Sequence, residues 1–108
     1  MERKKGLETY RRFKSQFPDY FKAVEALGAT IHRAGPLDER TIQLTQLAAA
    51  AAIRSEGAVH SHARRALEAG ASLEDIRHAL LVLTSTIGFP TVIAAMSWVE
   101  DVVGQKQE

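Results

Sequence analysis

The alanine run Ala48–Ala52 constrains the fold of this chain more than any other feature of the sequence. Alanine is the best helix former, and because it is the smallest residue with a Cβ, a helix face made of it lets another helix approach closely. Around the run, apolar residues recur at helical spacing, and no segment shows the period-two pattern of a half-buried strand. The sequence therefore predicts an all-α protein with a central αα-hairpin, formed by the alanine-rich helix and its neighbour.

Proline, glycine and capping residues divide the helical pattern into about six helices. The expected helices span about residues 2–16, 18–33, 39–56, 58–68, 73–87 and 90–103. Pro18 ends the first helix and opens the second, Gly57 breaks or kinks the alanine-rich helix, and Gly88 stops the fifth. With 108 residues, the chain is long enough for one domain and too short for two, so one helical domain is expected over residues 1–108.

Three helix boundaries carry specific capping signals. Asp38 is expected to be an N-cap, with Thr41 at the third position after it. Ser72 and Asp75 resemble a capping box in which Asp75 takes the place of the usual Glu or Gln. Gly70 stands where a C-terminal glycine would end a helix. These signals place helix ends near residues 38, 70 and 72.

The composition excludes several classes of function. The chain has no cysteine, which excludes disulfides, thiolate metal sites and a thiol nucleophile. Its net charge of +1 does not favour nucleic-acid binding, and the basic residues near the N-terminus are expected to form a solvated helix face. The longest apolar stretch, Leu47–Ile53, is far shorter than the roughly 20 residues of a membrane helix, and no signal peptide is visible. We therefore expect a cytoplasmic protein that binds neither nucleic acid nor membranes.

An ordered set of short motifs lies in the stretch from Leu37 to Ala95, which is over half of the chain. The motifs are Leu37-Asp38-Glu39-Arg40-Thr41, the alanine run, the segment from His62 to Gly70, the segment from Asp75 to Leu80, and Gly88-Phe89-Pro90. Their order and spacing resemble the carboxymuconolactone decarboxylase and alkylhydroperoxidase D-like family. The resemblance implies a helical bundle that forms a homo-oligomer, a trimer or a hexamer, with sites near subunit contacts. We expect the alanine face and the apolar last helix, which bears Trp98, to hold that oligomer together.

The redox members of this family carry four functional positions: a glutamate, a Cys-x-x-Cys pair, and a histidine four residues after the second cysteine. Alignment on His62 places the two lost cysteine positions at Ser55 and Ala58, and the glutamate position at Gln43. A dithiol reduces its substrate through a thiolate and a second, resolving thiol, and serine and alanine supply neither. Thiol peroxidase activity is therefore not expected, and the resemblance favours the non-redox branch that includes the decarboxylase itself.

His62 is the strongest catalytic candidate, because an unperturbed histidine titrates near neutral pH and can act as a general acid or base. Gln43 and Ser55 are expected to hydrogen-bond a substrate, and Arg65, three residues from His62, to hold its carboxylate. The resemblance then implies a cofactor-free lyase for a small carboxylated lactone. Two alternatives remain. His62 can be a structural residue that joins two helices, and the protein can be a non-catalytic oligomeric scaffold or binding subunit.

Glu56, His60 and His62 raise the question of a metal site. Two histidines at positions i and i+2 of a helix do not converge, whereas the usual zinc pair of a helix lies at i and i+4. Glu56 and His60 do have the i, i+4 spacing, and we expect them to form a partly solvated surface pair. The sequence therefore predicts no metal ion and no cofactor.

Overall fold

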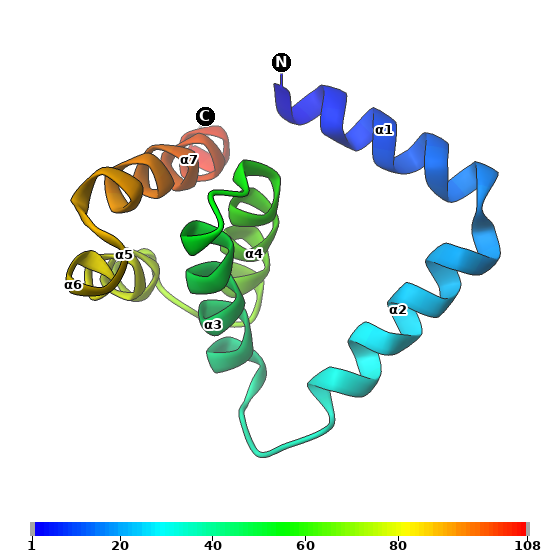
Figure 1. The fold of residues 1–108 in the computed structure, drawn as a ribbon, viewed down its shortest axis with the longest axis horizontal. Coiled ribbons are helices and arrows are strands. Elements are labelled where there is room, and N and C mark those ends of the chain that lie inside the picture. The colour runs from blue at the N-terminus through cyan, green and yellow to red at the C-terminus, as the bar shows by residue number, and fades with distance from the viewer. Residues whose placement is uncertain (1, 108) are drawn as a thin grey trace. The chain divides into compact units, whose positions relative to one another are not determined.

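The computed structural model describes residues 2–107, with the side chains of residues 6–103, and these residues form seven helices and no strand (Figure 1). The helices are α1 (Glu2–Gln16), α2 (Pro18–His32), α3 (Glu39–Ala52), α4 (Glu56–Glu68), α5 (Leu73–Leu81), α6 (Thr84–Ile87) and α7 (Phe89–Gln107). The all-α prediction is confirmed, and the one-turn helix α6 is the element that the sequence did not predict.

The helices divide into two compact units, residues 1–36 with α1 and α2, and residues 37–108 with the others. The prediction of one domain stays a prediction.

In residues 1–36, aromatic side chains join α1 to α2. Pro18 occupies the first turn of α2, where its missing N–H costs no hydrogen bond. The rings of Tyr10 and Phe21 meet edge to face with centroids 5.3 Å apart, and Lys14 Nζ donates to Glu25 Oε2 at 2.9 Å. An apolar cavity of about 620 Å³ lies beside these rings. None of the residues of α2 is buried, so this pair of helices encloses no core of its own.

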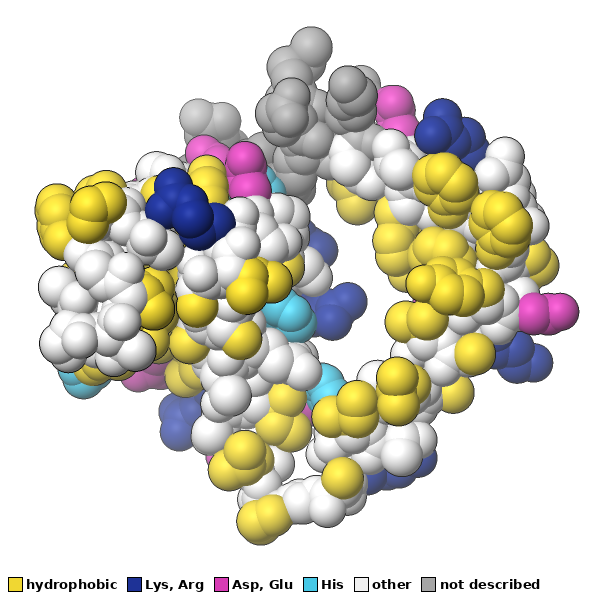
Figure 2. Space-filling model, viewed as in Figure 1, with side chains coloured by type: hydrophobic (Ala, Val, Ile, Leu, Met, Phe, Trp, Pro, Cys, Tyr) yellow, Lys and Arg dark blue, Asp and Glu magenta, His cyan; other side chains and the backbone are white. Residues whose placement is uncertain are grey.

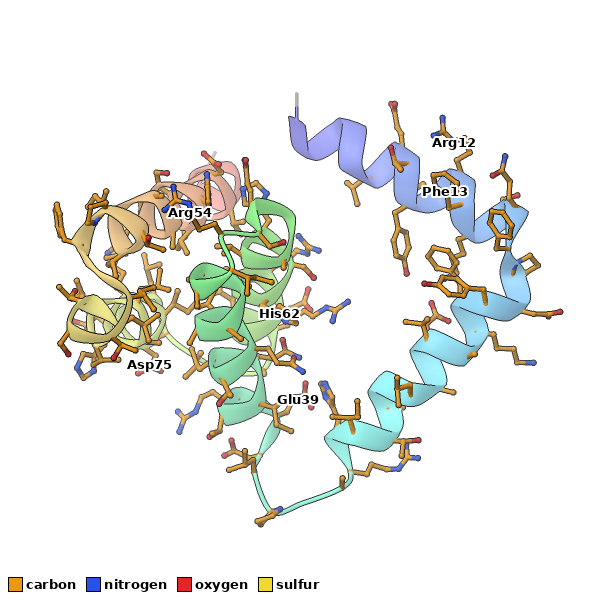
Figure 3. The ribbon with its side chains drawn as sticks, viewed as in Figure 1. Arg12, Phe13, Glu39, Arg54, His62 and Asp75 are labelled. Atoms are coloured by element: carbon orange, nitrogen blue, oxygen red, sulfur yellow. The ribbon has the colours of Figure 1, made fainter. Side chains whose placement is uncertain are left out.

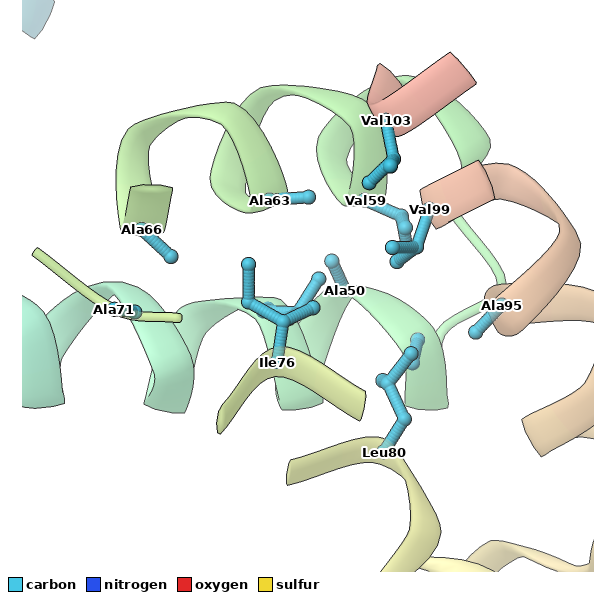
Figure 4. Packing of buried hydrophobic residues seen from close by; sticks show 12 residues of the cluster. Ala50, Val59, Ala63, Ala66, Ala71, Ile76, Leu80, Ala95, Val99 and Val103 are labelled. Atoms are coloured by element: carbon cyan, nitrogen blue, oxygen red, sulfur yellow. The ribbon is translucent and has the colours of Figure 1, made fainter. Parts of the chain in front are cut away.

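The core lies in residues 37–108, where α3, α4, α5 and α7 meet (Figure 4). Leu47 from α3, Val59 from α4 and Ile76 from α5 have no exposed surface. Burial of each such side chain contributes about 1.5–3 kcal/mol. Small side chains complete the cluster, namely Ala50, Ala51, Ala63 and Ala66. The predicted αα-hairpin is therefore confirmed as α3 and α4, which lie side by side and are joined by three residues.

Part of each face that was expected to hold an oligomer together packs inside the chain. Ala50 and Ala51 are buried in the core described above, and α7 buries Val92, Ala95 and Val99. Large exposed apolar side chains occur on α7, at Phe89 and Ile93, but more of them lie on α1 and α2, where Figure 2 shows them gathered in yellow. Those of residues 1–36 are Leu7, Tyr10, Phe13, Phe17, Tyr20, Val24, Leu27 and Ile31. Any contact with a second copy has more apolar surface available there than on the alanine face.

The three predicted capping signals are confirmed. Asp38 accepts a hydrogen bond from the backbone N–H of Thr41 at 2.8 Å. Ser72 and Asp75 form a reciprocal capping box, with both side chain-to-backbone bonds at 2.9 Å. Gly70 ends α4 with a φ of 98°, a left-handed conformation that glycine adopts at little cost. Local sequence therefore determines where α3 and α5 begin and where α4 ends.

The break between α3 and α4 differs from the prediction. Gly57 does not interrupt a helix but lies in the first turn of α4, and α3 ends earlier, at Ala52. Arg54 carries the turn with a φ of 57°, in the place where helix ends usually have glycine. The turn is closed by a hydrogen bond from the N–H of Ser55 to the carbonyl of Ala50 at 3.0 Å, and Arg54 Nη1 donates to Thr91 Oγ1 of α7 at 2.9 Å. The tertiary contact thus accompanies a backbone conformation that an arginine rarely adopts.

No helix within residues 2–107 is both long enough and apolar enough to cross a membrane.

Candidate functional site

His62 and Gln43 meet across the α3–α4 hairpin. Gln43 lies in the second turn of α3 with 2% of its surface exposed, and His62 lies half-buried in the middle of α4. His62 Nδ1 and Gln43 Oε1 are 2.8 Å apart, which is hydrogen-bonding distance. The structure therefore brings together two of the residues that the sequence singled out. Figure 3 labels His62 on α4 and Glu39 on α3.

Glu39 extends this pair into a chain of three side chains. Gln43 Nε2 donates to Glu39 Oε2 at 2.9 Å, one turn back along α3. A carboxylate only accepts, so the amide NH₂ group of Gln43 must face Glu39 and its oxygen must face His62. The amide oxygen in turn only accepts, so Nδ1 of His62 carries a proton and donates it to Gln43. In the neutral ring, the basic lone pair then belongs to Nε2.

The hydrogen-bonded series Glu39, Gln43 and His62 determines what the site can do chemically. A histidine with Nδ1 held as a donor can accept or deliver a proton only through Nε2. The bond that His62 donates to Gln43 also fixes the ring orientation, because Gln43 is itself buried and held by Glu39. The arrangement corresponds to a positioned general acid or base, and equally to a structural bridge between two helices.

Ser55 and Ala58, which the sequence comparison with the redox members predicts to be the lost cysteine positions, lie before His62 on the same chain segment. Ser55 is the N-cap residue of α4, half-buried, and its side chain makes no capping hydrogen bond. Ala58 lies one turn before His62 on α4 and offers no polar group. Seven residues of helix rise about 10 Å, so the hydroxyl of Ser55 is two turns from the imidazole of His62. The two side chains share a side of α4 without bonding directly.

The arginines near this segment, Arg54 and Arg65, differ in exposure and in hydrogen bonding. Arg65 is exposed in the last turn of α4, one turn beyond His62. Arg54 is engaged with Thr91, as described above. That Arg65 holds a carboxylate therefore stays a prediction, which rests on the spacing of three residues that puts Arg65 and His62 on neighbouring parts of a helix surface.

His60 contacts a different neighbour. Its Nε2 lies 3.1 Å from Asp101 Oδ2 on α7 and 3.8 Å from Glu56 Oε2 on its own helix. The prediction that His60 and His62 point to different sides of α4 is confirmed, since one contacts α7 and the other α3. The prediction of a solvated pair is wrong for His60, which is 5% exposed.

Two hydrogen-bond partners, Glu39 of Gln43 and Asp101 of His60, were not predicted from the sequence. Glu39 lies four residues before Gln43, so helical spacing alone could have placed the two side chains together. Asp101 is 41 residues from His60, and no local pattern joins them. Only the packing of α7 against α4 brings that carboxylate to the histidine.

Comparisons with known proteins agree on one family and one fold. The family model for the carboxymuconolactone decarboxylase family matches residues 18–101. An uncharacterized protein of Methanocaldococcus jannaschii is 29% identical over 99 residues, which cover 92% of each chain. Two solved structures share the fold. A carboxymuconolactone decarboxylase family protein from Legionella pneumophila has a TM-score of 0.82 at 20% identity, covering 94% of this chain and 91% of its own. A Thermotoga maritima protein has a TM-score of 0.74 at 24% identity, covering 96% and 97%.

The family match covers well over half of the chain and includes Gln43, Ser55, Ala58 and His62. The chain itself has no cysteine at any position. This protein therefore belongs to the carboxymuconolactone decarboxylase family, as a member without the cysteine pair.

Proposed function

We propose that this protein is a cofactor-free lyase that removes a carboxyl group from a small carboxylated lactone, with His62 as the proton-transferring residue. Loss of CO₂ breaks a C–C bond and leaves its electron pair on the substrate. That pair is stabilised as an enolate conjugated with the lactone carbonyl, and a proton that passes from Nε2 of the protonated His62 ring to carbon completes the reaction. The ring then regains a proton from water. A general acid or base that exchanges this proton typically accelerates such a step about 10²–10⁴-fold.

The observation that carries the proposal is the hydrogen bond between His62 Nδ1 and Gln43 Oε1 at 2.8 Å. It assigns the ring proton to Nδ1 and proton exchange to Nε2, and the Glu39–Gln43 contact holds the acceptor in place. A fixed tautomer on a half-buried ring is what general acid–base catalysis requires. Among the side chains of Gln43, Ser55 and His62, only the imidazole is of a kind that serves as a general acid or base.

Substrate binding is proposed for residues on the same two helices. Arg65, exposed one turn beyond His62, can pair with a carboxylate through its fork of N–H donors. Ser55 supplies a hydroxyl that is not used in capping. Gln46 lies one turn beyond Gln43 on α3, and its buried Oε1 has no hydrogen-bond partner among the described residues. Since an unsatisfied buried acceptor costs about 1–3 kcal/mol, a bound hydroxyl group or water there is favourable.

The test is turnover of a panel of small carboxylated lactones, followed by CO₂ release. His62→Gln should lower kcat by about 100- to 10,000-fold. Ser55→Ala should cost far less, about 2- to 13-fold, which corresponds to one hydrogen bond of about 0.5–1.5 kcal/mol. The matched control is His78→Gln, because His78 is an exposed histidine on α5. Full activity in His62→Gln would show that the site is assigned to the wrong residue.

The second candidate function is a non-catalytic oligomeric scaffold, and the same hydrogen bond favours it in a different way. Because Gln43 is buried, its bond to His62 also ties α3 to α4. Under this alternative, His62→Gln lowers the melting temperature or dissociates the oligomer, and no lactone of the panel is decarboxylated. Measuring melting temperature and activity on the same variants separates the two functions.

A homo-oligomer is part of both proposals, and family membership favours a trimer or a hexamer. The support in this chain is the exposed apolar surface of α1 and α2, which includes Leu27 and Ile31. Apolar patches of this kind usually mark an interaction surface.

A further inference from the structure

Besides the pair centred on His62, three metal-ligating side chains converge where α4 packs on α7. Glu56 and His60 come from the first two turns of α4, and Asp101 comes from α7. Their ligand atoms all lie within 4.8 Å of one another. His60 Nε2 is 3.1 Å from Asp101 Oδ2 and 3.8 Å from Glu56 Oε2.

We propose that Glu56, His60 and Asp101 bind a divalent transition-metal ion, Zn²⁺ in the first instance. Zinc binds imidazole nitrogen and carboxylate oxygen at about 2.0–2.2 Å, which places neighbouring ligand atoms about 3–3.6 Å apart. The distance from His60 Nε2 to Asp101 lies within this range and the distance to Glu56 lies just above it, so small rotations of the exposed carboxylates suffice. The imidazole ligand distinguishes the site from the all-oxygen sites that Mg²⁺ and Ca²⁺ prefer.

The exposed fractions of the three side chains are compatible with an ion that enters from solvent. The side chain of His60 is 7% exposed, whereas those of Glu56 and Asp101 are 42% and 53% exposed. The nitrogen ligand is therefore held from the protein side, and the carboxylates are open to water. Three protein ligands with an open side leave the fourth position of a tetrahedral ion to water.

Charge balance also favours a dication. Two carboxylates that approach one imidazole repel each other, and a protonated imidazole compensates for only one of their charges. A divalent ion with a neutral imidazole balances both. The sequence predicted no metal because His60 and His62 do not converge. The third ligand is instead Asp101, which the fold delivers from 41 residues away.

The proposed ion would act as a clamp between α4 and α7, separate from His62, which bonds to α3. A ligand that binds only the folded state raises its stability in proportion to the logarithm of its concentration. Zinc should therefore raise the melting temperature, and a chelator should reverse the rise. This role does not depend on the lyase proposal.

The experiment is calorimetric titration of ZnCl₂ into the untagged, chelator-treated protein, with Co²⁺ absorption spectra as a report on coordination. We expect one ion per chain. Asp101→Asn and Glu56→Gln should each weaken binding by about tenfold or more, and should abolish the rise in melting temperature. Both residues are substantially exposed, so these variants should fold even where His60→Gln does not.

Two control variants test whether the loss of zinc affinity is specific to the proposed ligands. Glu100→Gln removes the neighbouring carboxylate of α7, which pairs with Arg77 at 3.0 Å, and should leave zinc affinity within about twofold. His62→Gln should do the same. Failure to bind one zinc ion per chain, or equal affinity in wild type and Asp101→Asn, would overturn the proposal.

Discussion

In residues 37–108 a core of large apolar side chains, including Leu47, Ile76 and Leu80, has no exposed surface, although other apolar side chains of this region are exposed. In residues 1–36, by contrast, none of the residues of α2 is buried, and Leu27 is 59% exposed. Both regions carry apolar residues at helical spacing, so their sequences look alike by this criterion. The difference shows that an amphipathic pattern alone does not predict whether a helix face is buried within its own chain.

The two regions also differ in what determines their helix ends. In residues 37–108, α3 and α5 begin at side-chain N-caps, Asp38 and Ser72. In residues 1–36, α2 begins after Phe17 without a side-chain cap, and Pro18 marks the start. The region with the core thus also has the stronger local signals, as expected where a segment must fold on its own contacts.

The largest predicted effect tests the core of residues 37–108. Leu80→Ala should lower the free energy of unfolding by about 2–5 kcal/mol, because the site is fully buried and the cavity cannot fully collapse. The adjacent Leu81 is 53% exposed, so Leu81→Ala should change stability by about 0.5 kcal/mol or less in the monomer. Urea unfolding of both variants measures the difference. Equal loss in the two would show that Leu81 is covered in solution.

The second prediction tests residues 1–36. Leu27→Ala should leave the helix content unchanged and weaken self-association, because the exposed side chain has few contacts to lose within the chain. If assembly buries it, the loss is about 1.5–3 kcal/mol per contact, roughly 10- to 150-fold in the dissociation constant. Sedimentation at micromolar concentration should show wild type above the 11.9 kDa mass of the chain and the variant shifted toward that mass. Wild type that sediments as a monomer contradicts the proposed oligomer.

The same contrast shows how far sequence reasoning reaches. The caps at Asp38 and Ser72 and the glycine at Gly70 were predicted correctly, because each depends on residues within one turn. The turn at Arg54 was not, since a left-handed arginine follows no local preference. At the candidate site, Gln43 and His62 were placed by family resemblance, and the structure joins them. Asp101 could not be predicted, because its approach to His60 depends on how α7 packs.

The smallest predicted effect concerns acid, and it arises at the capping residues Asp38 and Asp75 of residues 37–108. Hydrogen bonds from Thr41, its side chain first and its backbone second, lower the pKa of the Asp38 carboxyl. The backbone N–H of Ser72 likewise lowers the pKa of Asp75 below its ordinary value of 3.8. The folded state therefore binds fewer protons than the unfolded state near pH 3–4. The stabilisation is complete above the pKa of the unfolded state, and is lost as pH falls through the lowered pKa values of the folded state.

Urea unfolding at pH 7 and pH 3 should show this loss of stability, and Asp75→Asn should reduce it because an amide does not titrate. The side-chain cap is missing from α2, so no comparable acid loss is expected from its N-terminus. An unchanged pH dependence in Asp75→Asn would mean that the acid sensitivity arises from other carboxylates.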